Sequence, residues 1–156
     1  MLLLSSFLWP SFTAFVSLAP MPQTRLARRR GFQCLHKYVV PSWTPAANSS
    51  VFGTCFTPHG HGHNYQLEVY LEGEVDPVTG MVINLADVDR ILKEAVDPLD
   101  QKHVNLEVPG LSGQVPTTER LARYLMNRLS KAFPEQVRLV KIRLYEYENL
   151  WVDLWT

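Results

Sequence analysis

The chain has 156 residues, of which 46% are hydrophobic and 19% are charged, and its formal net charge is zero. This length is typical of one domain with a buried core. The balanced charge provides no overall attraction for nucleic acid or for a membrane surface, so we expect neither as a partner. The charge is unevenly distributed, because four arginines lie within residues 25–30 whereas the first acidic residue is Glu68.

The first residues of the chain are expected to lie outside the folded domain. Residues 1–20 are uncharged and apolar, but prolines interrupt them, so they do not make a convincing membrane span. They also lack the basic region that precedes the apolar core of a secretory signal. Residues 1–23 are interpreted as an N-terminal extension of a cytoplasmic protein, and residues 24–156 as one domain. Organellar targeting by residues 1–30 stays open as the alternative.

Alternating apolar residues predict a strand at the start of the domain. It covers residues 24–38 and places Phe32, Cys34 and His36 on one face. Residues 41–50 are rich in proline and serine, and this composition predicts a loop.

A second strand is expected over residues 63–75, where alternation places His63 and Tyr65 on the apolar face. Residues 76–80 have the composition of a turn. Residues 81–85 are interpreted as the returning strand of a hairpin.

Two helices and two more strands follow. Residues 85–97 carry apolar side chains at helical spacing, and a second helix is expected from Thr117 to the next proline. The intervening residues 98–116 predict a long loop, and loops of that length are often functional. Residues 137–147 and 149–155 predict the last two strands.

The segment Cys55–Tyr65 holds one thiol, three imidazoles and two glycines. His61 and His63 are two positions apart, so on an extended backbone both rings project from one face and can occupy two positions around a transition metal, usually zinc. The candidates for a third ligand are His36, His59 and His103. His36 is preferred because it ends a strand on the inward-facing side. Three histidines leave a fourth position open, as in catalytic zinc sites.

The two cysteines are interpreted differently. Cys55 lies beside the histidine cluster, where a bound cation is expected to lower the pKa of the thiol. The thiolate could then act as a nucleophile or as a general base, and the sequence does not choose between these roles. Cys34 is interpreted as a small buried residue of the first strand.

Further candidates are two carboxylates and a histidine. Glu146 shares the parity of Ile142 and Leu144 in its strand, and a carboxylate on an apolar face is costly unless it is paired or used. A structural ion pair is the alternative interpretation. Asp100 and His103 are three apart in the long loop and could form an acid–imidazole pair, with a solvated loop as the alternative.

These segments resemble the family of 6-pyruvoyl-tetrahydropterin synthase and 6-carboxy-tetrahydropterin synthase over residues 24–156. The matching motifs are FQCLH (32–36), Cys55-x5-HGHNY, DPVTGMVINLADV (76–88), PLDQKHVNLEVP (98–109), PTTE (116–119) and LYEYEN (144–149). The five-residue gap in the cysteine motif is similar to that of the pyruvoyl branch.

The resemblance implies an α+β fold in which a four-stranded antiparallel sheet has two helices on one face, the tunnelling fold. It implies that subunits assemble into a barrel as a homohexamer, with active sites between subunits. It also implies a zinc-dependent lyase whose substrate is 7,8-dihydroneopterin triphosphate. Elimination of triphosphate and an internal redox step would yield 6-pyruvoyl-tetrahydropterin.

The resemblance also implies roles for individual residues. The residues that match the zinc ligands are His36, His61 and His63. Cys55 matches the catalytic cysteine, and Glu146 matches the glutamate that anchors the pterin ring. The second pterin-pocket motif corresponds to Thr117, Thr118 and Glu119.

The loop after the first predicted helix departs from the family pattern. The family has Asp-His where this chain has Asp100 and Gln101, and an amide cannot take up a proton at neutral pH. His103 is therefore the candidate for the proton relay with Cys55 and Asp100. Gln33 and Cys34 also stand where the family carries small residues.

Two alternatives stay open. The first is 6-carboxy-tetrahydropterin synthase activity on the queuosine (deazapurine) pathway, which analysis of the product would separate from the pyruvoyl reaction. The second is a non-catalytic scaffold that binds zinc and pterin but lost the relay through Gln101, for which tight pterin binding without turnover would be diagnostic.

Overall fold

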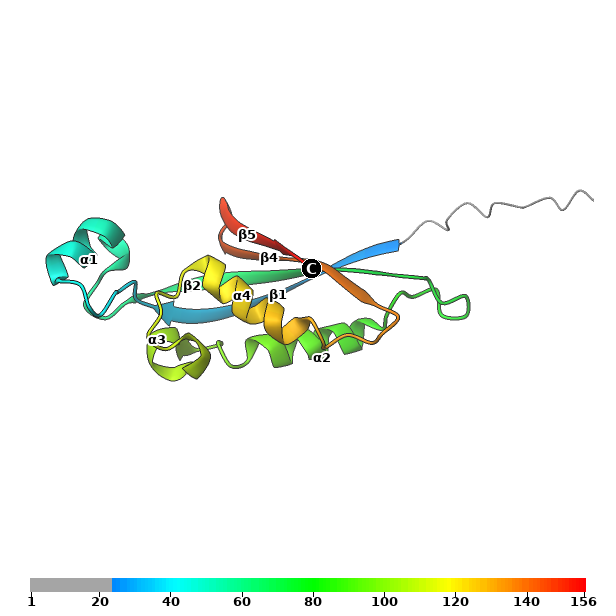
Figure 1. The fold of residues 1–156 in the computed structure, drawn as a ribbon. Helices are drawn as coiled ribbons and strands as arrows, with labels where there is room; N and C mark the ends of the chain where they lie inside the picture. Colours follow the sequence, from blue (N-terminus) through cyan, green and yellow to red (C-terminus); the bar gives the residue numbers. More distant parts are fainter. Residues whose placement is uncertain (1–23) are drawn as a thin grey trace, which may run out of the picture.

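The computed structural model describes residues 24–156, and the expectation of an extension at residues 1–23 lies outside the described residues. The domain is built on one sheet with the strand order β3-β1-β2-β4-β5 (Figure 1). The strands are β1 (Thr24–His36), β2 (His61–Gly73), β3 (Lys102–His103), β4 (Arg138–Tyr147) and β5 (Leu150–Trp155). The four long strands are antiparallel, as predicted, and the two-residue β3 joins the edge of β1 in parallel.

Two long helices cover one face of the sheet (Figure 1). They are α2 (Leu85–Val96) and α4 (Thr118–Leu129), and both predicted helices are confirmed. Asn84 caps the first, since its side chain accepts a hydrogen bond from the Ala86 N–H at 2.9 Å. Fully buried side chains of α4 pack toward the sheet at helical spacing, namely Leu121, Leu125 and Leu129. The core therefore lies between these helices and the sheet, while the opposite sheet face is more open.

The predicted loop at residues 41–50 was wrong in part, because it contains most of a helix, α1 (Pro45–Phe52). The start signals are present in the sequence. The Thr44 side chain accepts a hydrogen bond from the Ala47 N–H at 3.2 Å, and proline occupies the first turn. The short helix η1 (Gly53–Cys55) follows directly.

The predicted returning strand at residues 81–85 was also wrong. The Asp76 carboxylate accepts hydrogen bonds from the Val78 and Thr79 N–H groups, and the Asp76 N–H donates to the Met81 carbonyl, so a loop closes here instead. Leu85 already begins α2. The physical reason is topological, since β2 pairs with β1 on one edge and with β4 on the other. At the Glu72 end of β2, next to the turn, both edges are paired, so none remains for a returning strand.

The predicted long loop at residues 98–116 carries β3, α3 (Val104–Glu107) and η2 (Pro109–Leu111). Buried apolar side chains hold it against the domain, namely Leu99, Val104, Val108 and Leu111. It is therefore an ordered segment rather than a free loop. No helix among residues 24–156 is long and apolar enough to cross a membrane.

The strand register positions the site at one end of the sheet. His36 lies directly opposite His61 across the β1–β2 pair, and Cys34 lies opposite His63. Pairing between β2 and β4 reaches only to the Gln66–Tyr145 pair. The remaining ends of these two strands are unpaired with each other, so the sheet is open beside the histidines.

Candidate metal centre and active site

Three imidazoles converge at this end of the sheet. The Nε2 atom of His36 lies 3.1 Å from Nε2 of His61 and 3.1 Å from Nε2 of His63. His36 is fully buried and His63 is nearly so, whereas His61, the first residue of β2, is half-buried. The structure therefore brings together the three histidines that the motif and the family resemblance predicted as ligands.

The tautomer of His36 leaves a lone pair directed at the cluster. Its Nδ1–H donates to the Pro116 carbonyl at 3.1 Å, and the Tyr65 hydroxyl lies 3.2 Å from the same nitrogen. Burial, with a smaller contribution from the neighbouring histidines, lowers the pKa of His36 to about 3. The ring is therefore neutral at physiological pH, as a metal ligand must be.

Glu146 adds a carboxylate to this group. It is buried near the end of β4, and its Oε1 lies 3.0 Å from Nε2 of His63 and 3.9 Å from Nε2 of His36. Its other oxygen accepts a hydrogen bond from the Thr118 hydroxyl. One donor atom from each of four residues lies within 4.8 Å of the others. They are His36, His61, His63 and Glu146.

The donor set fits a transition-metal ion. An ion that binds nitrogens tetrahedrally at 2.0–2.1 Å holds them about 3.3 Å apart, close to the observed spacing. The Nε2 lone pair of His36 points toward the Nε2 atoms of His61 and His63. A cation bound between the three nitrogens would stabilise this close approach. The Pro116 carbonyl supplies the outer hydrogen bond that usually orients a ligating imidazole. These four residues, called the metal group below, could therefore hold a metal ion.

Cys55 is not one of the four residues of this group. It ends η1, is half-buried, and its carbonyl accepts a hydrogen bond from the Tyr38 N–H at 2.9 Å. Burial, followed by the nearby Glu146 carboxylate, raises the pKa of the thiol. The protein groups alone thus oppose the lowering of this pKa that the sequence predicted, and the positive charge of a bound metal would act in the opposite direction.

The predicted pterin-pocket motif lies at the start of α4. Thr117 is the N-cap residue, Thr118 is buried, and Glu119 is exposed in the first turn. The Thr118 hydroxyl bonds to Glu146, and the carbonyl just before the motif, that of Pro116, bonds to His36. This short segment therefore holds both a candidate metal ligand and the candidate pterin anchor.

The structure places the loop candidates at the β1 edge. The Asp100 carboxylate accepts a hydrogen bond from the Gln33 N–H at 2.9 Å, and the His103 N–H donates to Glu107 at 2.8 Å. Among residues 24–156 no hydrogen bond joins Asp100 or His103 to Cys55. The relay of these residues with Cys55 therefore stays a prediction.

Gln101 adopts a left-handed backbone conformation with φ of 60°. Its N–H donates to the Gln33 carbonyl at 2.7 Å, and the two side-chain amides approach each other at 3.4 Å. Two of the positions at which this chain departs from the family pattern, Gln33 and Gln101, are therefore in contact. The larger Gln33 side chain has Gln101 as its hydrogen-bonding partner.

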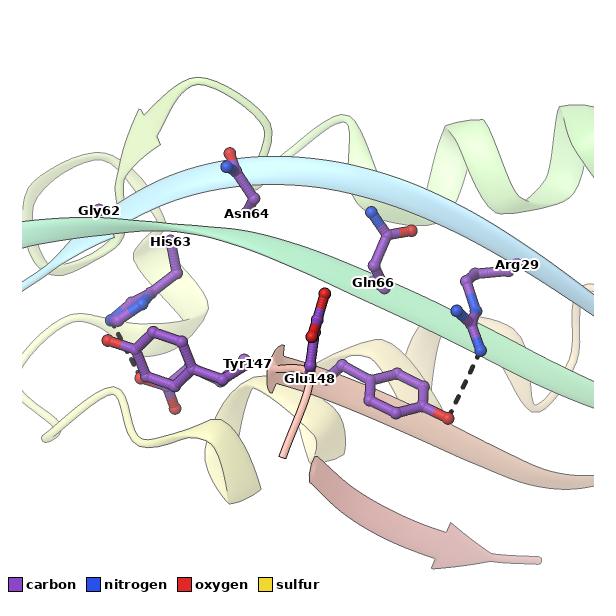
Figure 2. Close-up of a pocket in the computed structure, with 9 residues that line it drawn as sticks. Arg29, Gly62, His63, Asn64, Gln66, Tyr147 and Glu148 are labelled. Atoms are coloured by element: carbon purple, nitrogen blue, oxygen red, sulfur yellow. Dashed lines mark hydrogen bonds and ion pairs between the residues drawn. The ribbon is translucent and has the colours of Figure 1, made fainter. Parts of the chain in front are cut away.

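A cavity of about 730 Å³ opens next to the cluster, where β2 and β4 separate. Figure 2 shows His63 and Tyr147 together at one end and Arg29 at the other. The remaining lining residues are Gly62, Asn64, Gln66, Tyr145, Glu146 and Glu148. The rings of Tyr147 and His63 are nearly perpendicular, and their centroids lie 4.9 Å apart. The cavity has the size of a small-molecule site, and both His63 and Glu146 line it.

Sequence reasoning missed two contributors to the site. Tyr65 was placed on the apolar face but not beside a metal ligand, although its position two residues after His63 on the same face was the available signal. The backbone carbonyl of Pro116 had no signal, because a main-chain acceptor carries no mark in the sequence. Both contact the same nitrogen of His36.

Comparison with known proteins gives a consistent result. The family model described as 6-pyruvoyl tetrahydropterin synthase matches residues 25–156. The chain is 41% identical over 128 residues to the human 6-pyruvoyl tetrahydrobiopterin synthase, covering 81% of this chain and 88% of that protein. A Pyrococcus furiosus dihydroneopterin monophosphate aldolase is 26% identical over 132 residues, covering 85% and 97%.

Comparison with solved structures agrees with the comparison of sequences. The structure of 6-pyruvoyl tetrahydropterin synthase from Caenorhabditis elegans superposes with a TM-score of 0.79 at 29% identity, covering 89% of this chain and 99% of that one. The matched region includes every residue of the histidine–glutamate group and the thiol beside it. The chain therefore belongs to the 6-pyruvoyl tetrahydropterin synthase family.

Proposed function

We propose that this protein is a zinc-dependent lyase that converts 7,8-dihydroneopterin triphosphate into 6-pyruvoyl-tetrahydropterin and triphosphate. The observation that carries the proposal is the convergence of three imidazoles and a buried carboxylate. The half-buried Cys55 lies close by in the fold, because its carbonyl accepts a hydrogen bond from Tyr38, two residues after His36. The names of the curated relatives support the same activity. Three nitrogen ligands favour zinc over the hard cations that prefer oxygen.

The bound ion would supply Lewis acidity toward the hydroxyl oxygens of the substrate side chain. Side chains of the protein itself are assigned proton transfer and recognition of the ring. We assign to Cys55 the transfer of protons to and from the side-chain carbons, because its thiol is near enough to Glu146 to be influenced by that carboxylate and it is not one of the four candidate ligands. The overall conversion needs no external oxidant, because the side chain is oxidised as the pterin ring is reduced.

Glu146 is the group that would recognise the ring. A carboxylate accepts hydrogen bonds from adjacent N–H groups of a pterin, and Glu146 lines the open cavity with its second oxygen held by Thr118. Because this carboxylate also lies 3.0 Å from His63, ring binding and side-chain chemistry occur on neighbouring groups. That proximity positions the substrate side chain over the metal group.

Incubation of zinc-loaded protein with 7,8-dihydroneopterin triphosphate tests the proposal. We expect stoichiometric release of inorganic triphosphate and a product with the mass of the pyruvoyl compound. The Cys55→Ala variant, loaded with zinc to the same content, is the matched control. A 6-carboxy product would assign the protein to the other branch, and tight binding of pterin without any triphosphate release would indicate a scaffold and overturn the lyase assignment.

We further propose that the functional unit is a homohexamer, as the family resemblance implies. In support, β5 and the short β3 form the two edges of the sheet, and the edge strand β5 carries the exposed side chains of Trp151 and Trp155. Large apolar side chains on an edge strand are typical of an assembly surface. Light scattering coupled to size-exclusion chromatography gives the mass, and a monomer at micromolar concentration would contradict the assembly.

A further inference from the structure

The thiol is carried by a segment that has almost no support from the sheet. This segment, Tyr38–Cys55, is called the thiol arm here, and it contains α1 and η1. Figure 1 shows α1 beyond the end of the sheet, away from α2 and α4. Asn48 is the only buried residue of α1, and the apolar Val51 is 62% exposed. The arm must therefore be held in shape by contacts within itself.

Asn48 makes most of the side-chain hydrogen bonds within the arm. Its side chain is 2% exposed, and its Oδ1 accepts a hydrogen bond from the Val40 N–H at 2.8 Å. Its Nδ2 group faces three carbonyl oxygens, those of Val40 at 3.1 Å, Thr44 at 3.2 Å and Trp43 at 3.4 Å. One amide thus ties the incoming chain of the arm to α1. Only an amide of this length offers both an acceptor and two donors.

The fixed α1 then determines where Cys55 lies. The Gly53 N–H donates to the Ser49 carbonyl at the end of α1, and η1 continues from that cap to Cys55. The arm closes where the Cys55 carbonyl accepts the Tyr38 N–H, two residues after the metal-ligand candidate His36. Beside that closure the ring of Tyr38 lies 4.9 Å from the ring of His36.

We propose that Asn48 is a positioning residue for the reaction, which holds the thiol of Cys55 beside the metal group through α1 and η1. The role is separable from folding, because the strands that carry the histidines do not depend on the arm. It is also separable from metal binding, because no candidate ligand lies within the arm. The part of the inference that concerns turnover rests on the proposed function.

Two variants and one control test the role. Asn48→Ala removes all the side-chain bonds, and Asn48→Asp keeps the acceptor but presents a carboxylate to three carbonyl oxygens. We expect both to lower kcat about 100-fold, the effect of misplacing a reacting group by about 1 Å, with KM and zinc content unchanged. Asn127→Ala, at an exposed asparagine of α4, should retain wild-type kcat.

Alkylation of Cys55 by iodoacetamide, followed by peptide mass spectrometry, provides a readout that needs no substrate. We expect about tenfold faster alkylation of Cys55 in both Asn48 variants, while the buried Cys34 stays unreacted. Thr44→Ala, which removes only the α1 cap, should give the same changes to a smaller extent. If the wild type shows no turnover, the lyase proposal fails and the alkylation rates alone still decide the role of Asn48.

Two results would overturn the inference. One is an Asn48→Ala protein whose Cys55 reacts at the wild-type rate and whose kcat is within twofold of wild type. The other is a variant that loses zinc in proportion to kcat or unfolds with the sheet, because Asn48 would then support the whole domain rather than the thiol.

Discussion

The two halves of the candidate active site are built on different kinds of support. The histidines and Glu146 lie on three paired strands whose inward faces are covered by α2 and α4. Cys55 lies at the end of the thiol arm, which projects from the sheet and is held by Asn48 and by stacked aromatic rings. We therefore expect the metal group to be held as firmly as the core. The thiol is held only by contacts within the arm.

Under the proposed function, this difference separates metal binding from proton transfer. Rigid strands suit ligands whose spacing must match an ion within a few tenths of an ångström. A group that exchanges protons with a substrate needs correct placement once the substrate is bound, and a small independent arm can provide this. The predictions below test whether the two halves can be disrupted independently.

The largest effect is expected from His63→Ala. Removing this imidazole takes away one nitrogen ligand and exposes the buried Glu146 carboxylate without its partner. Zinc content should fall to near zero and turnover should be lost with it. Atomic emission spectroscopy of the purified protein measures the metal, and His59→Ala, at an exposed histidine of the same motif, is the control. Full zinc retention would exclude His63 as a ligand.

The next effect concerns the thiol. Cys55→Ala should lower kcat by about 10²–10⁴-fold, the usual contribution of a positioned acid or base. Zinc content should stay at the wild-type level, because Cys55 lies outside the ligand group. Steady-state rates and metal content measured on the same preparation check both statements. Turnover at the wild-type rate would show that another group moves the protons.

The loop at the β1 edge tests whether the thiol has a proton partner. Gln101→His restores the residue type that the family pattern has at this position, and it removes the contact with Gln33. If the relay is missing, kcat should rise by about tenfold or more, within the range of acid–base catalysis. If His103 already acts as the partner, Gln101→His should change little and His103→Gln should abolish the activity. The pH–rate profiles of the two variants distinguish these cases.

A milder effect is expected behind the metal group. Tyr65→Phe removes the hydroxyl that lies 3.2 Å from Nδ1 of His36 and leaves the Pro116 bond in place. Zinc affinity should fall by about tenfold, the lower end of outer-shell effects. Competition with a chelator measures this affinity. Tyr70→Phe removes a hydroxyl from the opposite face of β2 and should leave the affinity unchanged.

The smallest effect is on stability at the open face of the sheet. Arg143 holds Asp153 with two hydrogen bonds of 2.6 Å, and these bonds lower the pKa of the Asp153 carboxyl below 3.8. Because the folded pKa lies below the unfolded one, the stabilisation is fully present above about pH 4 and is lost as the pH falls through the folded pKa.

Asp153→Asn should therefore lower the free energy of unfolding by no more than about 1 kcal/mol at pH 7, since water screens the pair. The difference from wild type should be smaller in acid. Urea unfolding at pH 7 and at pH 3 measures both values. A difference that grows on acidification would have the wrong sign for this carboxylate.

Particular residues show how far the sequence could be interpreted. The alternation around His63 and Tyr65 and the parity of Glu146 in its strand predicted their burial, because a strand has only two faces. Helical spacing predicted α2 and α4, because side chains three and four positions apart share one face of a helix. The returning strand at residues 81–85 could not be excluded by local composition, because only the sheet order shows that both edges of β2 are taken.

By itself the sequence determined which side chains share a face and which motif carries the candidate ligands. It also determined the family, because motif spacing is a property of the chain. Only the tertiary structure decided that Glu146 lies within reach of His63, that Asn48 is buried inside the thiol arm, and that Asp100 and His103 have no bond to Cys55 within one chain. Those facts depend on contacts between segments far apart in the chain, and such contacts leave no local pattern.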